Sequence, residues 1–176
     1  MHRNPARESL FESWLDTHRG IIFKVTQAYA RSPREGAELQ QEIKLQLWNS
    51  LSTYSGEAKA STWIYRVSLN AALAWRRSAN RRESKIEPGA DLNQVPGLIA
   101  SPADAVDQRD LLDKLYEAIR AMNEFDRALV LLMLDGLAYG EIAVVTGLTE
   151  NHVGVALTRA RKHLAALMKG VIDELE

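Results

Sequence analysis

The fold is decided by the stretch Tyr139-Gly-Glu-Ile-Ala-Val-Val-Thr-Gly-Leu-Thr-Glu-Asn-His-Val-Gly-Val-Ala-Leu157. Two helices that cross at a steep angle need a small residue at the crossing, and Ala143 supplies it. The turn between them needs a residue that tolerates a positive φ, and Gly147 follows four positions later. Two apolar residues that fill the angle and a hydroxyl that caps the second helix complete the pattern: Leu148, Val153 and Thr149. The register predicts a helix-turn-helix, with an ordinary helical hairpin as the alternative.

The second helix of this motif is the part expected to contact DNA. In helix-turn-helix proteins the N-terminal part of the second helix enters the major groove, where its outward side chains reach base edges. The helix continues into a basic stretch, Arg159-Ala-Arg-Lys-His163, that suits phosphates. Basic residues near a helix C-terminus also occur simply because the helix dipole favours them. The candidate DNA contacts are Thr149, His152, Val155, Thr158, Arg159, Arg161 and Lys162.

The N-terminal half has the periodicity of amphipathic helices. Apolar residues at three- and four-residue steps predict one long helix over residues 10–29, and Pro33 marks the break after it. A second helix is expected to bury its apolar residues over 39–51. A third is expected to begin at Ser61 or Thr62, because a hydroxyl can satisfy the amides at a helix start.

A linker is expected to separate this half from the C-terminal one. Residues 86–100 contain two Pro-Gly pairs and no sustained period, so no helix is predicted there. Helical periodicity returns afterwards, and no alternating strand pattern occurs anywhere in the sequence. We therefore predict an all-α chain of two helical domains joined by a linker, with boundaries at 1–85, 86–103 and 104–176.

The third helix carries basic residues together with one amide. Arg66, Asn70, Arg77 and Arg81, here called the basic stripe, share one side of the helix, and Trp63 lies about one turn before them. Cations beside an aromatic ring suit unpaired bases, because bases stack on rings while cations hold phosphates. The alternative is that the tryptophan belongs to the core and the arginines only solubilise the helix. With the loop that precedes the helix, the candidate contacts are Tyr54, Lys59, Trp63, Arg66, Asn70, Arg77 and Arg81.

The second helix offers a different surface, here called the acidic face. It contains Glu38, Gln41 and Glu42, with Leu45 projecting among them and Trp48 at its edge. An apolar residue inside an acidic face suggests a docking site for a basic protein partner. A single exposed leucine is also common on ordinary protein surfaces.

The composition limits the classes of protein to consider. The chain has 176 residues, a net charge of -1, 46% hydrophobic residues and no cysteine, which excludes disulfides and thiolate metal sites. Its first residues lack the apolar core of a signal peptide, and its longest apolar run, 128–134, is too short to span a bilayer, so we expect a cytoplasmic protein. Four dispersed histidines and no glycine-rich phosphate loop predict no catalytic centre, no metal site and no cofactor.

Together these pieces resemble a bacterial RNA polymerase sigma factor of the extracytoplasmic-function (ECF) group. Ala37-Glu-Leu-Gln-Gln-Glu-Ile-Lys-Leu-Gln-Leu-Trp48 is similar to region 2.2 of that family, and the block from Tyr54 to Asn70 is similar to its next segment. Gly136-Leu-Ala-Tyr-Gly-Glu-Ile-Ala and Thr158-Arg-Ala-Arg-Lys-His-Leu are similar to its region 4. The order of these segments matches the family over nearly the whole chain.

The resemblance implies a transcription initiation factor and not an enzyme. Its partners would be core RNA polymerase, through the beta-prime clamp helices, and promoter DNA, with an anti-sigma factor as a further candidate. The acidic face would dock on the polymerase. The loop from Tyr54 to Lys59 and Asn70 would capture a flipped base of the minus-ten element, while Trp63 and the basic stripe would hold the melted strand. The C-terminal helix would read the minus-thirty-five element.

Two other interpretations stay open. A helix-turn-helix regulator of the LuxR type, which does not bind core polymerase, would leave the N-terminal half unexplained. A sigma-like scaffold or antagonist would bind a protein partner without opening DNA. The chain also departs from the family where Gly154 and Ala156 replace frequent basic residues. This departure suggests weaker nonspecific binding, or readout of DNA shape with a close approach at the glycine.

Overall fold

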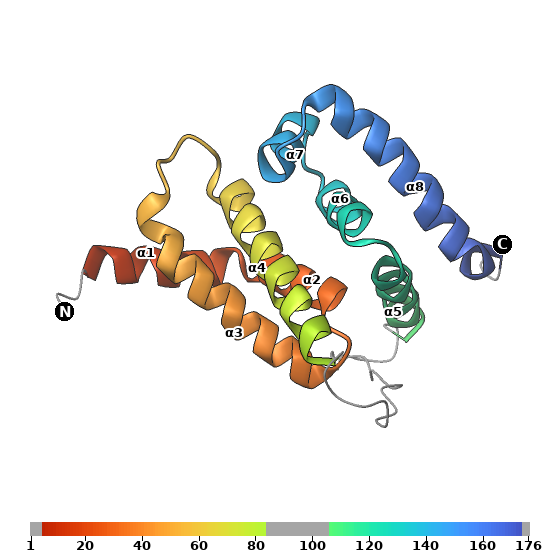
Figure 1. Cartoon of the computed structure of the whole chain (residues 1–176), viewed down its shortest axis with the longest axis horizontal. Helices are drawn as coiled ribbons and strands as arrows, with labels where there is room; N and C mark the ends of the chain where they lie inside the picture. Colours follow the sequence, from red (N-terminus) through yellow and green to blue (C-terminus); the bar gives the residue numbers. More distant parts are fainter. Residues whose placement is uncertain (1–4, 84–105, 174–176) are drawn as a thin grey trace. The chain divides into compact units, whose positions relative to one another are not determined.

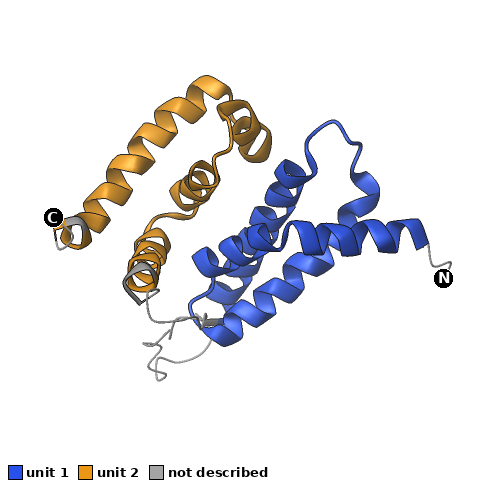
Figure 2. Ribbon diagram, turned by 180° about the vertical axis from the view of Figure 1, so that it is seen from behind, with its two compact units in different colours: residues 1–93 blue, residues 94–176 orange. Residues whose placement is uncertain are grey.

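The computed structural model describes residues 5–83 and 106–173, and every regular element within these ranges is helical. The chain divides into two compact units, residues 1–93 and 94–176 (Figure 2). The predicted all-α class with two helical parts is therefore confirmed. The predicted linker, 86–103, lies outside the described residues. No helix in the described ranges is long and apolar enough to cross a membrane.

Unit 1 is built around the packing of α2 and α3 on α4 (Figure 1). Its core is apolar, since Val25, Leu39, Ile43 and Ile64 are each exposed by 1% or less. The predicted inward row of the second helix is thus buried. The elements of the unit are α1 (Pro5–Thr17), α2 (Arg19–Tyr29), α3 (Pro33–Ser50), the 3-10 turn η1 (Leu51–Thr53) and α4 (Ala60–Glu83).

The helix predicted over residues 10–29 is in fact two helices, and this prediction was wrong. The chain leaves the helical conformation at His18, where φ is −111° and ψ is 17°. Backbone bonding continues through the break, because the His18 N–H donates to the Trp14 carbonyl at 2.9 Å and the Ile21 N–H donates to the His18 carbonyl at 3.0 Å. The apolar spacing also continues across the break, so periodicity alone does not reveal it.

The starts of α3 and α4 also differ from the prediction. Pro33 is the first residue of α3, where its fixed φ suits a helix start, and the Ser32 hydroxyl accepts the amide of Glu35 at 3.2 Å. In α4, by contrast, Ser61 and Thr62 lie inside the helix, which begins at Ala60. The predicted hydroxyl cap of α4 is therefore wrong.

In the described part of unit 2, α5, α6 and α7 bury an apolar core against α8 (Figure 1). Ile119, Leu129, Ile142 and Leu157, one from each helix, are each exposed by 0%. The elements are α5 (Val106–Ala121), α6 (Glu124–Leu134), α7 (Tyr139–Thr146) and α8 (Glu150–Asp173).

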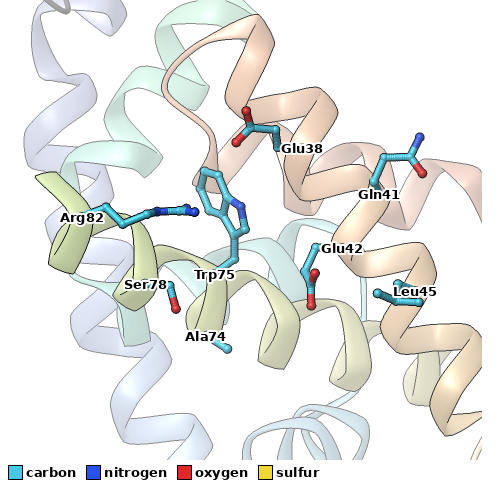
Figure 3. A pocket seen from close by; sticks show the side chains of 8 residues that line it. All are labelled: Glu38, Gln41, Glu42, Leu45, Ala74, Trp75, Ser78 and Arg82. Carbon is cyan, nitrogen blue, oxygen red and sulfur yellow. The ribbon is translucent and has the colours of Figure 1, made fainter.

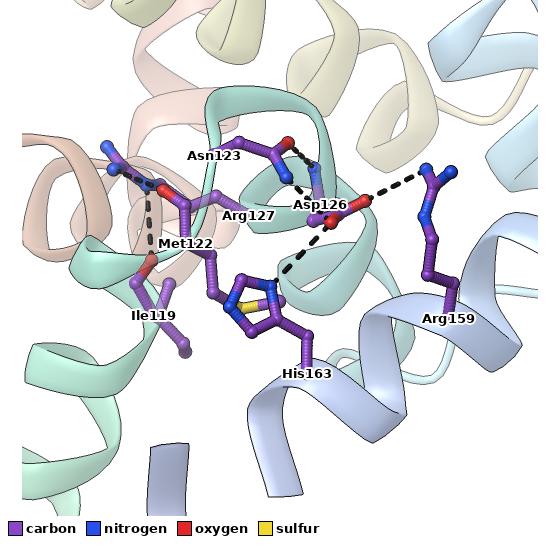
Figure 4. Close-up of polar contacts among 7 residues, drawn as sticks. All are labelled: Ile119, Met122, Asn123, Asp126, Arg127, Arg159 and His163. Atoms are coloured by element: carbon purple, nitrogen blue, oxygen red, sulfur yellow. Dashed lines mark hydrogen bonds and ion pairs between the residues drawn. The ribbon is translucent and has the colours of Figure 1, made fainter. Parts of the chain in front are cut away.

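The corner between α5 and α6 is fixed by a buried arginine. The guanidinium of Arg127, in α6, donates to the carbonyl oxygens of Ile119 and Met122 at 3.2 and 2.9 Å (Figure 4). It also donates to the Arg120 carbonyl at 2.6 Å. The last carbonyls of a helix lack partners within the helix. Arg127 therefore caps the end of α5 from the next helix.

The helix-turn-helix is formed by α7, the turn and α8, as predicted. Gly147 has a φ of 76°, and its N–H donates to the Ala143 carbonyl at 2.8 Å. The Thr149 hydroxyl accepts the amide of His152 at 3.3 Å and so caps α8. Val153 fills the angle and is completely buried. The turn glycine, the cap and this apolar position are therefore confirmed.

Candidate nucleic-acid and partner-binding sites

The basic stripe lies on α4, a single helix of 24 residues. Arg66, Asn70, Arg77 and Arg81 are all exposed, whereas Ile64, Leu69 and Ala72 on the opposite side are buried. An unbroken helix fixes the spacing of these four side chains along one side. The stripe therefore presents four polar side chains along one side of α4, with Leu73 and Ala74 between Asn70 and Arg77.

Two other arginines of the same helix do not belong to the stripe. Arg76 is 3% exposed and lies inside unit 1, where its Nη1 is 3.5 Å from the carboxylate of Glu35 in α3. Arg82 lines a groove between α3 and α4. The arginines of the C-terminal part of α4 therefore face three directions, and Arg77 and Arg81 are the pair that faces outward on the stripe.

An aromatic cluster joins the loop before α4 to the helix itself. The rings of Tyr54 and Trp63 lie 5.5 Å apart, measured between centroids, so the structure brings these two predicted residues together. Trp14 of α1 contacts both, at 4.9 Å from Tyr54 and 5.4 Å from Trp63. Trp63 is half-buried in this cluster. Its ring therefore has aromatic neighbours already, and the core interpretation of this tryptophan is partly correct.

Trp14 was not among the predicted site residues, although the sequence contains a signal for it. Arg7, Phe11 and Trp14 follow one another at steps of four and three residues, which places them on one side of α1. All three contact aromatic residues of other elements. Because no residue of α1 is fully buried, this row indicates the side by which α1 attaches to the rest of unit 1.

A groove of about 760 Å³ runs between α3 and α4 (Figure 3). Four residues of the acidic face line its α3 side, and Leu45 among them is 51% exposed. The α4 side was not predicted, although its residues recur at steps of three and four. The groove is lined by Glu38, Gln41, Glu42, Leu45, Ala74, Trp75, Ser78 and Arg82.

The charges of the groove are divided between its two walls. Glu38 and Glu42 stand on α3, and Arg82 stands on α4 with its side chain extending towards Trp75 (Figure 3). The Glu38 carboxylate also accepts a hydrogen bond from Arg34 at 3.1 Å. The groove thus combines an apolar centre with an anionic wall, as expected for a site that receives a partner with both apolar and basic side chains.

Trp48 does not line this groove and is instead covered by α1. The Arg7 guanidinium carbon lies 4.5 Å from the centroid of the Trp48 ring, and Phe11 meets the same ring edge-on at 5.2 Å. Arg7 also donates a hydrogen bond to the Trp48 carbonyl. The structure therefore separates Trp48 from the other four residues of the acidic face.

The recognition helix α8 exposes most of its predicted contacts. Val155 is 73% exposed, and His152, Thr158 and Lys162 are also exposed. The Thr158 hydroxyl donates to the Gly154 carbonyl at 2.9 Å, so its proton is engaged within the helix and its oxygen can still accept. These side chains form a mixed apolar and polar surface of the kind that reads base edges.

Three basic residues of α8 contact side chains of α6. An Nη of Arg159 lies 3.3 Å from a carboxylate oxygen of the buried Asp126, and His163 Nδ1 lies 3.9 Å from the other oxygen (Figure 4). Arg161 Nε donates to the sulfur of Met133 at 2.9 Å. The basic end of α8 is therefore partly organised by the unit itself.

Gly154 is covered by a side chain of the same unit. A Cβ placed on Gly154 would lie 3.4 Å from the Tyr139 ring, and the glycine is half-buried. Tyr139 therefore occupies one side of Gly154, and a close approach of DNA at this glycine stays a prediction.

A helix-turn-helix together with a second helical unit that carries a basic helix is typical of a DNA-binding protein. Residues 10–82 match the family model of sigma-70 region 2, and residues 112–164 match that of sigma-70 region 4. The chain belongs to the sigma-70 family of RNA polymerase sigma factors, in its ECF group.

Named relatives agree with this assignment. The ECF RNA polymerase sigma factor SigX of Bacillus subtilis (strain 168) is 21% identical over 174 residues, which cover 95% of this chain and 90% of that protein. The ECF RNA polymerase sigma-E factor of Escherichia coli (strain K12) is 26% identical over 136 residues, 71% of this chain and 69% of that protein.

Two solved structures share the fold. The sigma factor RpoE, crystallised with the anti-sigma factor NepR from Bartonella quintana, matches with a TM-score of 0.71 and 15% identity over 90% of this chain and 96% of its own. CnrH, in complex with the cytosolic domain of CnrY, matches with a TM-score of 0.63 and 16% identity over 93% of this chain and 90% of its own.

Proposed function

We propose that this chain directs core RNA polymerase to promoters and helps to open them, through contacts made by the residues described above. The observation that carries the proposal is the presence of both sigma regions in order, region 2 over 10–82 and region 4 over 112–164. A chain with both regions is a promoter-recognising transcription initiation factor. A helix-turn-helix regulator that does not bind polymerase would have no use for the first region.

The proposed polymerase contact is the groove between α3 and α4. Its exposed Leu45 is the apolar anchor, and Glu38 and Glu42 supply a charged rim for basic residues of the beta-prime clamp helices. Trp75 extends the apolar part of the surface onto α4. Trp48 contributes indirectly, because it anchors α1 to α3.

The proposed minus-ten contact lies along α4 and the loop before it. The loop from Tyr54 to Lys59 and the amide of Asn70 receive a flipped base, since an amide can both donate to and accept from an exposed base edge. Arg66, Arg77 and Arg81 hold the adjoining phosphates of the melted strand.

The proposed minus-thirty-five contact is the exposed side of α8. Val155, Thr158 and Arg159 face base edges, with His152 beside them near the start of the helix. Phosphate contacts come from the residues at the two ends of this surface: Thr149, Arg161 and Lys162.

We also propose where this chain acts and what regulates it. Its targets are core polymerase and chromosomal DNA, so its proposed place of action is the cytoplasm, and it has no catalytic activity of its own. RpoE of Bartonella quintana binds the anti-sigma factor NepR. By analogy, an anti-sigma factor is a candidate regulator of this chain.

The test is transcription in vitro from a promoter library by core polymerase with and without the purified chain. A sigma factor makes transcription from a subset of promoters depend on the chain and co-purifies with core polymerase. A helix-turn-helix regulator would bind DNA in the absence of polymerase and would not co-purify. An antagonist would bind a protein partner and support no transcript.

A further inference from the structure

Helix α1 is attached to unit 1 in an unusual way. None of its residues is fully buried, and Leu10 on it is 42% exposed. Its contacts run along the row of Arg7, Phe11 and Trp14, all of which meet aromatic rings of other elements. Core packing alone therefore does not explain why α1 is held against the rest of unit 1.

Trp14 lies at the end of this row and completes a triangle of rings. The centroid distances are 4.9 Å from Trp14 to Tyr54, 5.4 Å from Trp14 to Trp63 and 5.5 Å from Tyr54 to Trp63. The interplanar angles of 83°, 57° and 61° are those of edge-to-face or tilted pairs, the favourable geometry for aromatic contacts. Trp14 takes part in two of the three contacts.

Tyr54 is also the residue that fixes the loop before α4. Its hydroxyl donates to the Ala58 carbonyl at 2.8 Å, and its N–H donates to the Leu51 carbonyl at 3.3 Å. Between Tyr54 and Ala58 the chain turns at Gly56, whose φ is 80°, and the residues of the turn are exposed. The orientation of the Tyr54 ring therefore sets the point at which the loop returns to α4.

We infer that Trp14 is a positioning residue for minus-ten recognition, because it locks Tyr54 and Trp63 and thereby preorganises the loop that receives the flipped base. The inference rests on the minus-ten function proposed above. Trp14 is itself half-buried among the two rings, so it acts through them. Preorganisation raises affinity because fewer loop conformations are lost on binding.

The test uses the full chain with Trp14→Leu, which keeps an apolar side chain and removes both ring contacts. Leu10→Ala, on the same helix but outside the triangle, is the matched control. Three quantities are measured: amide hydrogen exchange over 55–59, affinity for core polymerase, and permanganate reactivity of a promoter selected by transcription. For Trp14→Leu we expect loop exchange to rise and promoter opening to fall by about tenfold, since two aromatic contacts are lost. Polymerase affinity stays at the wild-type value, and Trp14→Phe recovers part of the loss.

Each outcome decides a different point. Suppose that Trp14→Leu shows wild-type loop hydrogen exchange and wild-type promoter opening, while Asn70→Ala shows reduced promoter opening. This result overturns the role of Trp14 and leaves the proposed minus-ten function standing. Wild-type opening with both variants overturns the minus-ten function, and the positioning role with it. If Trp14→Leu loses its helical circular dichroism, Trp14→Phe weakens the same two ring contacts and keeps the Tyr54–Ala58 hydrogen bond. Unchanged loop exchange in that variant refutes the inference.

Discussion

The carboxylate of Asp126, in α6, lies 3.3 Å from a guanidinium nitrogen of Arg159, in the recognition helix α8. The Asp126 side chain is 5% exposed and that of Arg159 is 68% exposed, so a buried anion holds an outward-facing cation. The Asn123 amide donates to the same carboxylate at 2.7 Å (Figure 4). The position of the exposed Arg159 side chain on α8 is therefore set from inside unit 2.

Asp126→Asn should weaken the contact that orients the Arg159 side chain while Arg159 itself stays in place. The variant keeps the size of the side chain but loses the charge, so we expect unfolding free energy to fall by about 1–2 kcal/mol in urea titrations. The preference for particular bases should also weaken, at the same positions of the DNA site at which Arg159→Ala weakens it. Binding selection from a DNA library measures this preference for both variants. Relaxed preference at other positions would show that the pair does not orient Arg159.

Arg159→Ala and Lys162→Ala should have different effects on DNA binding. Loss of a base-reading arginine changes the preferred sequence and costs about 1–3 kcal/mol of discrimination at one position. Loss of a phosphate-binding lysine weakens all sequences alike and lowers the slope of log K against log salt by about 1. Binding titrations at several salt concentrations measure both effects. An equal loss for every sequence with Arg159→Ala contradicts its role in reading bases.

Leu45→Arg should weaken binding to core polymerase by about tenfold or more, because it places a charge at the apolar centre of the groove. The matched control is Leu10→Arg, which changes a leucine of similar exposure outside the groove. Affinity is measured by fluorescence anisotropy with labelled chain, and circular dichroism checks the fold. Unchanged affinity with an intact spectrum excludes the groove as the docking site.

Asn70→Ala should reduce promoter opening while polymerase binding and the fold stay intact. Asn70 is exposed on α4, so its loss removes a base contact and no core packing. Permanganate reactivity of promoter thymines measures opening, and a template with a pre-melted bubble should recover part of the loss. Wild-type reactivity would mean that Asn70 is an ordinary surface residue.

Gly154→Ala should stabilise unit 2 by roughly 0.5–1 kcal/mol, because alanine favours a helix more than glycine does. The added Cβ would meet the Tyr139 ring at 3.4 Å, a tolerable contact, so minus-thirty-five affinity should change little. Urea unfolding measures the change in stability, and DNA titration measures the change in minus-thirty-five affinity. A stabilised variant with strongly reduced DNA affinity would instead support the interpretation that DNA approaches this glycine closely.

Local patterns made part of the fold predictable. The turn at Gly147 and the cap at Thr149 depend on φ preference and on a hydroxyl near free amides, both of which are properties of single residues. The inward rows of α2 and α3 follow from helical spacing. These features were correctly predicted because their causes lie within a few residues of one another.

Features that depend on contacts between helices were not predictable in this way. Helical spacing puts Arg76 on the buried row of Leu69 and Ala72, but it does not reveal the partner of the buried guanidinium, which is Glu35 of α3 at 3.5 Å. The role of Trp14 depends on rings from a loop and from α4. The break at His18 interrupts no apolar period, so helical spacing continues through it and does not mark it.

The capping of α5 by Arg127 has a consequence for the order in which unit 2 forms on the ribosome. The chain emerges from its N-terminal end, so α5 leaves the exit tunnel before the arginine that completes it. Until residue 127 is outside, the carbonyls of Arg120 and Met122 lack the guanidinium and depend on water, and the end of α5 frays. The corner closes once the first turn of α6 brings in the guanidinium. A nascent chain arrested before residue 127 should therefore expose a protease-sensitive α5, and a chain arrested beyond α6 should protect it.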